Sequence, residues 1–203
     1  MGDHPIYAAL YDRLTRPMEE GGLARRRGQL LSVARGRVLE VGGGTGANLA
    51  HYPADVTLTV LEPDGAMRRR MLARDPALAI IPTCTEDADF PPDSFDTVVC
   101  TLVLCTVDDL GGALARIPSW LRPDRQLLFL EHVHAGGARG RLQTLATPVW
   151  SRVVPGCRLD RDPVVAMRAA GLAVTDCERF HLPRGNVFVG AAVQGAARLR
   201  SAA

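Results

Sequence analysis

The segment LEVGGGTGANL, residues 39–49, places a glycine-rich loop directly after a short apolar run. Glycine inside an element costs roughly 0.5–1 kcal/mol relative to alanine, so a cluster of glycines indicates that bare backbone is needed there. A buried strand followed by such a loop is typical of anion- and nucleotide-binding sites, because a ligand can approach the backbone closely. We expect NLAHY, residues 48–52, to continue a helix that the glycines open.

Apolar runs and helical patterns alternate along the chain, which predicts an α/β fold with a doubly wound, mostly parallel sheet. The expected strands are 37–41, 57–61, 79–81, 96–101 and 126–133, and the expected helices are 7–35, 65–74, 109–121 and 164–170. Two later runs, LAVTDCERF and NVFVGAAV, predict an antiparallel C-terminal hairpin at one sheet edge, which gives seven strands. The last residues, 195–203, are expected to fray.

The length of 203 residues favours a single domain, 1–203. Within it we expect a helical cap over 1–35 and an insertion or lid over 134–163, between the fifth strand and the last helix.

The 24 basic residues are all arginine, which excludes lysine Schiff-base chemistry and is typical of a GC-rich bacterial genome. With a formal net charge of +2, the chain has no nucleic-acid-binding signature.

The five cysteines lie at positions 84, 100, 105, 157 and 177 and form no CxxC pair. Their odd number and their scatter argue against a disulfide framework and against zinc, so no metal is expected and a cytoplasmic setting is favoured. No apolar run approaches the ~18 residues of a membrane span, so no transmembrane segment is expected.

Two cofactor classes fit the glycine loop. Gly42, Gly44 and Ala47 match the dinucleotide fingerprint G-x-G-x-x-G/A, so an NAD(P)-binding oxidoreductase is one alternative. Glu40 would repel a diphosphate and suits a cationic ligand such as S-adenosylmethionine, which carries a sulfonium and an ammonium. Glu62 ends the next strand, where a carboxylate can bind the ribose hydroxyls of either cofactor. A binding protein without turnover is a third alternative.

Four segments resemble, in order and spacing, the motifs of seven-stranded (class I) S-adenosylmethionine-dependent methyltransferases. They are VLEVGGGTGANL, LTVLEPD, PPDSFDTVVCTLVLCTV and LRPDRQLLFLEHV, spanning roughly residues 37–133. VVCTLVLCTV, LEHV, Trp150 and GCRL are most similar to the methyltransferase-like thiol S-methyltransferases. LRPDRQ departs from the LRPGG that is usual in the family. The animal thiol enzymes have a hydrophobic N-terminal anchor, which is not expected here, so the resemblance does not imply membrane association.

The resemblance implies a Rossmann-like methyltransferase fold, S-adenosyl-L-methionine as cofactor, and a set of cofactor-binding residues. The implied contacts are Gly42, Gly44 and Gly46 in the loop, Glu40 near the amino-acid end, Glu62 at the ribose, Pro63 and Met67 beside the adenine, Thr85 and Glu86 at the adenine edge, and Cys100 and Thr101 where methionine and acceptor meet. Tyr11 is a candidate to close over the cofactor, with plain packing as the alternative. A core position is the alternative for Met67.

The acceptor is expected to be a small molecule, with an apolar thiol favoured. Methyl transfer needs an aligned nucleophile at ~3–3.5 Å and exclusion of water, and no metal. A thiol with a pKa near 8.5 needs little help from a base. His132, at a strand end, is a candidate general base, with a hydrogen-bonding role as the alternative. O-, N- or C-methylation of a phenol, quinol or phospholipid head group is the alternative reaction.

Three further groups of side chains have plainer interpretations. The apolar residues Leu142, Leu145, Val149, Trp150, Val153 and Val154 are expected to form either an apolar lid or part of the core. The runs 25–27 and 68–70, three arginines each, are expected to be solvated, because consecutive helical residues point in different directions. Cys105 is expected to be an inert thiol. The sequence leaves the oligomeric state open.

Overall fold

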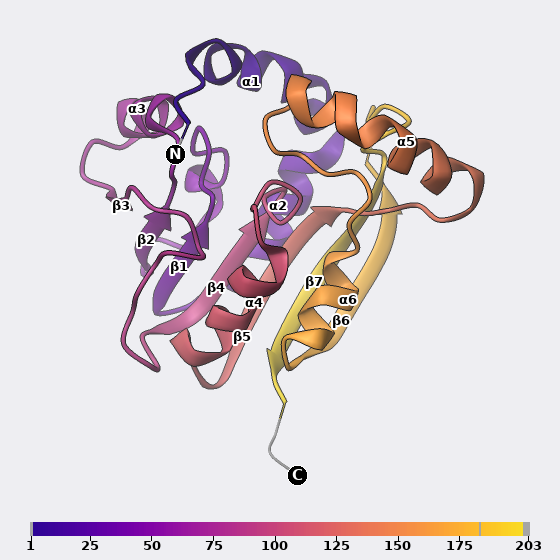
Figure 1. Cartoon of the computed structure of the whole chain (residues 1–203). Helices are drawn as coiled ribbons and strands as arrows, with labels where there is room; N and C mark the ends of the chain where they lie inside the picture. Colours follow the sequence, from indigo (N-terminus) through magenta and orange to yellow (C-terminus); the bar gives the residue numbers. More distant parts are fainter. Residues whose placement is uncertain (1, 183, 201–203) are drawn as a thin grey trace.

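The computed structural model describes residues 2–182 and 184–200, which form one seven-stranded sheet in the order β3-β2-β1-β4-β5-β7-β6 (Figure 1). The strands are β1 (Arg37–Val41), β2 (Thr57–Leu61), β3 (Ala79–Ile81), β4 (Phe95–Thr101), β5 (Leu121–His132), β6 (Leu172–His181) and β7 (Ala191–Leu199). The first five are mutually parallel, and β7 runs antiparallel between β5 and β6. The predicted α/β sheet with a reversed C-terminal hairpin is therefore confirmed.

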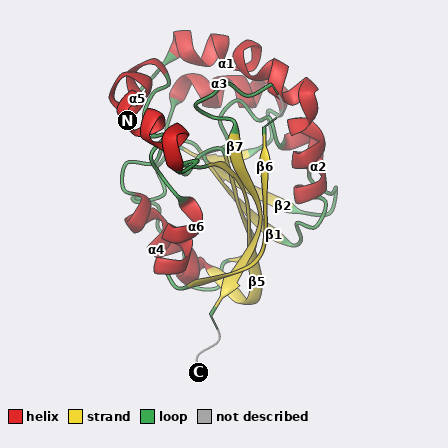
Figure 2. Cartoon of the chain, turned by 90° about the vertical axis from the view of Figure 1, so that its right-hand side faces the viewer, coloured by secondary structure: helices red, strands yellow, loops and turns green. Residues whose placement is uncertain are grey.

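Helices cover both faces of the sheet, as Figure 2 shows. The helices are α1 (Pro5–Met18), α2 (Ala24–Leu31), α3 (Gly65–Arg74), α4 (Leu110–Trp120), α5 (Gly137–Val153) and α6 (Pro163–Ala169). α4 and α6 pack on one face and α2 on the other, whereas α1, α3 and α5 lie towards the carboxyl ends of the parallel strands. In the part of the chain that the structure describes, no helix is both long and apolar enough to cross a membrane.

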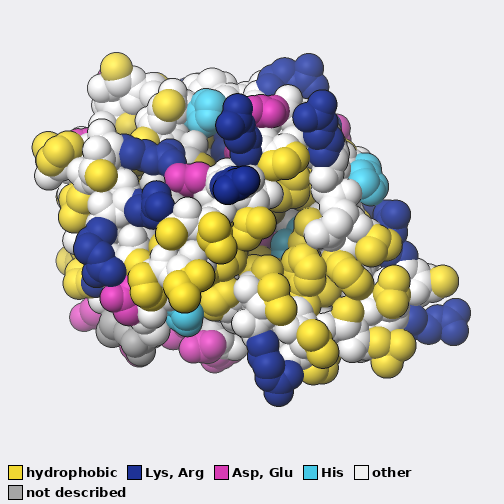
Figure 3. Space-filling view, turned by 90° about the horizontal axis from the view of Figure 1, so that it is seen from above, with side chains coloured by type: hydrophobic (Ala, Val, Ile, Leu, Met, Phe, Trp, Pro, Cys, Tyr) yellow, Lys and Arg dark blue, Asp and Glu magenta, His cyan; other side chains and the backbone are white. Residues whose placement is uncertain are grey.

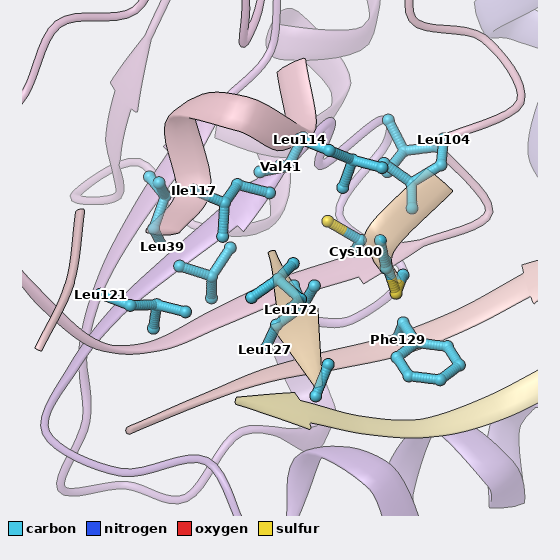
Figure 4. Close-up of a cluster of buried hydrophobic side chains, with 14 of the residues drawn as sticks. Leu39, Val41, Cys100, Leu104, Leu114, Ile117, Leu121, Leu127, Phe129 and Leu172 are labelled. Atoms are coloured by element: carbon cyan, nitrogen blue, oxygen red, sulfur yellow. The ribbon is translucent and has the colours of Figure 1, made fainter. Parts of the chain in front are cut away.

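The core forms because each central strand is apolar on both sides, as parallel strands covered by two helix layers require. Successive strand residues point to opposite faces, so Val98 packs in the cluster under α4 and α6 and Val99 packs in the cluster under α2. Figure 4 shows the α4-side cluster, in which Leu114 and Ile117 meet Leu39 and Leu127. These layers hold the strand ends rigidly in place.

Of the two breaks that the N-terminal residues suggest, Pro17 and the pair Gly21-Gly22, only the glycine pair divides the helical region. Pro17 lies inside α1, one residue before its end. Gly22 has φ 126° within the wide turn Glu19–Leu23 that joins α1 to α2. Because side chains other than glycine rarely adopt that backbone conformation, Gly22 sets the angle between the two helices.

Two other local expectations were wrong, and one helix was not predicted. NLAHY forms turns and a short 3-10 helix, Leu49–His51, because only the stretch 47–56, which includes Pro53, separates the glycine loop from β2. Residues 134–163, for which no element was predicted, contain the long helix α5. Residues 195–199 are not frayed: they belong to β7, which pairs with strands on both sides, and the strand begins only at Ala191.

Candidate active site

The carboxyl ends of β1, β2, β4 and β5 meet at one edge of the sheet, below α1 and α5 (Figures 1 and 2). Ligands of open α/β sheets bind outside the carboxyl ends of the strands. Seen from above in Figure 3, this face is hollowed near its middle, and hydrophobic side chains gather around the hollow. The residues expected to bind the cofactor lie at the ends of β1 and β4, on the loops that follow β1, β2 and β3, and on α1 and α3.

The three loop glycines have positive φ angles but meet different neighbours. φ is 63° at Gly42, 58° at Gly44 and 86° at Gly46. A Cβ on Gly42 would collide with Val103, and one on Gly46 would lie 2.8 Å from Leu49. A Cβ on Gly44 would meet nothing within 4 Å. Gly42 and Gly46 are therefore required by packing, whereas Gly44 borders open space that a ligand can fill.

Glu62 connects the end of β2 to the glycine loop. Its Oε2 accepts a hydrogen bond of 2.7 Å from the Gly44 N–H, and its Oε1 accepts one of 2.8 Å from the Asp64 N–H. Burial raises the pKa of Glu62, and the two backbone hydrogen bonds oppose that rise. A carboxylate has about four acceptor positions, so Glu62 keeps capacity for two hydroxyl donors. This fits the expected ribose contact.

Glu40, on β1, is the acceptor at the centre of a buried polar network. Its Oε1 accepts from Asn48 Nδ2 at 2.9 Å and its Oε2 from the Tyr52 hydroxyl at 2.8 Å. Asn48 also donates to Thr101 Oγ1 at 2.8 Å, and Arg27 Nη1 donates to Thr101 Oγ1 and Asn48 Oδ1 at 3.0 and 2.8 Å. The network fixes a carboxyl group directly before the glycine loop.

Arg27 is the main residue of this network that sequence reasoning misplaced. It was expected to be solvated, but it is only 3% exposed. Its Nε also donates to Glu19 Oε1 at 3.1 Å, which compensates the buried guanidinium charge. Arg25 of the same run is exposed as expected. Asn48 and Tyr52, which lie shortly after the glycine loop, were also missed.

The Glu40 network makes a testable contribution to stability. Burial raises the pKa of Glu40 to about 7, whereas an unfolded glutamate has a pKa near 4.3. As the pH rises, Glu40 therefore loses its proton in the unfolded state first. Its contribution to the free energy of unfolding is full below about pH 4 and is lost as the pH rises to about 7. We expect Glu40→Gln to match the stability of the wild type at pH 4 and to be more stable at pH 8 without cofactor, by roughly 3–4 kcal/mol.

Denaturant unfolding of both cofactor-free proteins at several pH values measures this difference. Parallel stability curves for wild type and Glu40→Gln would show that folding leaves the pKa of Glu40 unchanged. The expected outcome means that Glu40 is partly protonated near neutral pH until a cation binds beside it.

α1 is attached to the glycine loop and to the start of α3 by polar contacts. Asp12 accepts from the Thr45 hydroxyl and from Arg74 Nη2, each at 2.6 Å. The His4 ring lies 2.7 Å from an Asp64 carboxylate oxygen. These contacts hold α1 across the expected cofactor position.

Tyr11 and the expected adenine-side residues lie around α3. Tyr11 packs with Met67 and with Tyr7, whose ring centroid lies 5.6 Å from that of Tyr11. Thr85 is buried, and Glu86 accepts from the Asp109 N–H at 3.0 Å. Pro63 is half-buried at the end of β2. These residues flank the loops that follow β2 and β3, and their roles towards a cofactor remain predictions.

Cys100 needs a correction. Its side chain is fully buried in the core cluster with Phe129, as Figure 4 shows. Because strand residues alternate, its neighbour Thr101 faces the polar network instead. Any contact of Cys100 with the cofactor would have to come from its backbone.

A second group of side chains lies beside the loop after β4. His132 Nε2 is 3.3 Å from Cys157 Sγ, and Trp150 Nε1 donates to the same sulfur at 3.3 Å. Cys105 also contacts Cys157, and hydrogen bonds from Cys105 and His132 lower the pKa of the Cys157 thiol. Cys105 was expected to be an inert thiol, and no role was predicted for Cys157. His132, engaged with Cys157, is poorly placed to serve freely as a base.

Glu131 supports the loop that carries Cys105. Its Oε1 accepts from the N–H groups of Val103 and Leu104 at 3.1 and 3.2 Å. Burial raises the pKa of Glu131 to about 7. Glu131 is thus a positioning residue for the loop between β4 and α4.

The apolar residues of α5, together with Val154, which follows the helix directly, divide into two sets. Trp150 and Val154 pack inward on Cys105, Cys157 and Leu159, together with Phe188. Leu142, Leu145, Val149 and Val153 face outward, and Leu145 is 79% exposed. The lid-or-core alternative therefore applies only to the inward set, which borders the Cys105 loop.

A family model described as a methyltransferase domain matches residues 13–175 of the chain. Human thiol S-methyltransferase TMT1B is 31% identical over 178 residues, which cover 82% of this chain and 73% of that protein. Human thiol S-methyltransferase TMT1A is 30% identical over 155 residues, 72% of this chain and 64% of that protein. A solved structure of an S-adenosylmethionine-dependent methyltransferase from Thermotoga maritima superposes with a TM-score of 0.68 at 17% identity, covering 96% of this chain and 98% of that one.

Proposed function

This chain belongs to the S-adenosylmethionine-dependent methyltransferases, and from that premise we propose that it methylates the sulfur of a small, apolar thiol. The observation that carries this proposal is the apolar cluster around Cys105, Cys157 and Trp150, which lies next to the loop after β4. The relatives TMT1B and TMT1A, each named a thiol S-methyltransferase, support the same acceptor class.

The cofactor supplies an electrophilic methyl group on a positively charged sulfur. Gly44 leaves the space that the cofactor enters, since its missing Cβ would meet nothing within 4 Å. Glu40 and its network favour the ammonium end of the cofactor, and Glu62 is the acceptor for the ribose hydroxyls. Tyr11, on α1, covers the cofactor and helps to exclude water.

The acceptor site follows from position and polarity. Cys105 lies just after β4 and His132 at the end of β5, and these two parallel strands are neighbours in the sheet. Trp150 and Phe188 pack against this point with ring centroids 5.3 Å apart. An apolar surround excludes water and favours an acceptor with a hydrophobic body. A thiol suits it, because its thiolate forms at moderate pH without a strong base.

A methyl-transfer screen with labelled S-adenosylmethionine tests the acceptor class. We expect aryl and alkyl thiols to react at least a hundredfold more efficiently, in kcat/KM, than phenols, amines and quinols of similar size. Across a series of thiols, the rising limb of log kcat/KM with pH should follow the pKa of each free thiol. If only oxygen, nitrogen or carbon acceptors are methylated, the thiol proposal is overturned and membership of the methyltransferase family is untouched.

A further inference from the structure

Three potential metal ligands from separate parts of the chain meet beside the acceptor position. Cys105 lies on the loop after β4, His132 ends β5, and Cys157 lies between α5 and α6. One ligand atom from each lies within 4.8 Å of both others, and all three residues are buried. Because they are separated by at least 25 residues along the chain, only the fold brings them together.

The separation of the donor atoms suits one ion. Zn–S bonds of about 2.3 Å and Zn–N bonds of about 2.0–2.1 Å at a tetrahedral angle place sulfur and nitrogen about 3.6 Å apart, and two sulfurs about 3.8 Å apart. The observed distance from Cys157 Sγ to His132 Nε2 is 3.3 Å. A displacement of a few tenths of an ångström therefore suffices to admit the ion.

The backbone fixes the two cysteine loops against each other. The Arg158 N–H donates to the Cys105 carbonyl at 2.8 Å, so the residue after Cys157 is bound to Cys105 itself. Gly156 has φ 74°, and a Cβ there would lie 3.0 Å from the Thr106 carbonyl oxygen. Bare backbone at Gly156 thus allows the close approach that brings the two sulfurs together.

The chemistry of the donors favours zinc over a harder ion. Two thiolates and a neutral imidazole form a Cys₂His set, which is a known catalytic zinc arrangement with one position left open. Two thiolates neutralise Zn²⁺, so the filled site carries no net charge within its apolar surround of Ala146, Val154 and Val189. The Trp150 N–H is aimed at Cys157 Sγ, as a donor to a thiolate ligand would be.

We propose that Cys105, His132 and Cys157 bind a Zn²⁺ ion whose fourth position accepts the sulfur of the methyl acceptor. The ion site stands by itself, whereas its role towards the acceptor rests on the proposed thiol methylation. The thiol binds zinc as a thiolate and releases its proton to solvent. A sulfur lone pair then forms the bond to the methyl carbon while the bond from that carbon to the sulfonium breaks. The electrons of the broken bond stay on S-adenosylhomocysteine, and the neutral thioether, a weaker ligand, dissociates.

Metal binding is tested first, without any acceptor. Protein purified without chelator is expected to contain about one zinc per chain by mass spectrometry of the elements. Metal-free, reduced protein titrated with Co²⁺ should develop thiolate-to-cobalt charge-transfer absorption and the intense visible bands of a tetrahedral site. Cys105→Ser and Cys157→Ser should each weaken Co²⁺ binding at least tenfold and reduce the charge-transfer band, and His132→Gln should weaken binding while retaining two thiolates.

Cys177→Ser is the matched control, because Cys177 is an exposed cysteine on β6, and it should bind Co²⁺ as the wild type does. A folded, reduced wild type that binds no Co²⁺ overturns the site, as does a band that survives in both Cys105→Ser and Cys157→Ser. The site is also overturned if the purified protein contains a Cys105–Cys157 disulfide and binds no metal once that disulfide is reduced.

The role of the ion is tested separately with the intact enzyme. An added thiol should increase the charge-transfer band of the Co²⁺ protein, and chelation should lower kcat for thiols at least a hundredfold, with recovery on adding Zn²⁺. Thiol methylation at full rate by the metal-free enzyme would refute the role of the ion and leave the proposed function standing. A metal site in an enzyme that methylates only phenols or amines would refute the thiol function and leave the metal site standing.

Discussion

Gly44→Val is expected to abolish binding of S-adenosylmethionine and of its demethylated product while the protein stays folded. Gly44 has φ 58°, so a side chain there is strained by ~1–2 kcal/mol. The larger effect is steric: apart from its chain neighbours, a Cβ there would meet no atom within 4 Å, so it would project into the open space that we propose the cofactor fills. We expect an affinity loss of at least a hundredfold, which corresponds to about 2.7 kcal/mol or more.

Gly171→Val separates the steric effect from the backbone strain. Gly171 has φ 84°, and a Cβ there would also meet nothing within 4 Å. It directly precedes β6, a strand parallel to β5, and so lies at the edge of the sheet opposite the candidate site. Both variants should lose similar stability in denaturant unfolding, and only Gly44→Val should lose binding in calorimetry. If a folded Gly44→Val protein binds S-adenosylmethionine with an affinity within twofold of that of the wild type, the cofactor does not bind at this loop.

Trp150→Ala should lower kcat/KM for large apolar thiols by roughly 30- to 100-fold, with little change in cofactor affinity. Trp150 packs inward with Phe188 against the cluster around Cys105 and Cys157. Truncating a well-packed aromatic side chain at a binding surface costs about 2 kcal/mol or more, which gives the expected range. Trp150→Phe restores much of the apolar surface without the indole N–H, so it measures the contribution of the hydrogen bond to Cys157.

Val149→Ala is the matched control, because Val149 precedes Trp150 on α5 and points outward with 68% of its surface exposed. Its kinetics should equal those of the wild type. If Trp150→Ala and Val149→Ala behave alike, the inward face of α5 does not contact the acceptor, and the acceptor site lies elsewhere on the hollowed face.

The pattern of apolar residues within each segment was enough to predict most of the strands of the sheet. The predicted strands 57–61 and 79–81 and the predicted helix 164–170 lie within a residue of β2, β3 and α6. This is because burial of one or both faces makes apolar residues recur at a regular spacing, which is visible within the element itself. The positive φ angles at Gly42, Gly44 and Gly46 agree with the bare backbone that the glycine cluster predicted. Glu62, placed at the end of the second strand by register, does contact the glycine loop.

The sequence by itself therefore determined most of the strands and the glycine loop, since each is set by residues close together in the chain. The class of cofactor followed from the resemblance of the motifs over residues 37–133 to a known family. Only the tertiary structure decided that Arg27 is buried, because three consecutive arginines look alike until the position of Glu19 and Asn48 is known. It alone brought Cys105, His132 and Cys157 together, since no local spacing encodes a contact between loops of different strands and helices. Packing between distant parts of the chain decides which side chains face each other across the site. The spacing of apolar residues within one segment carries no information about that packing.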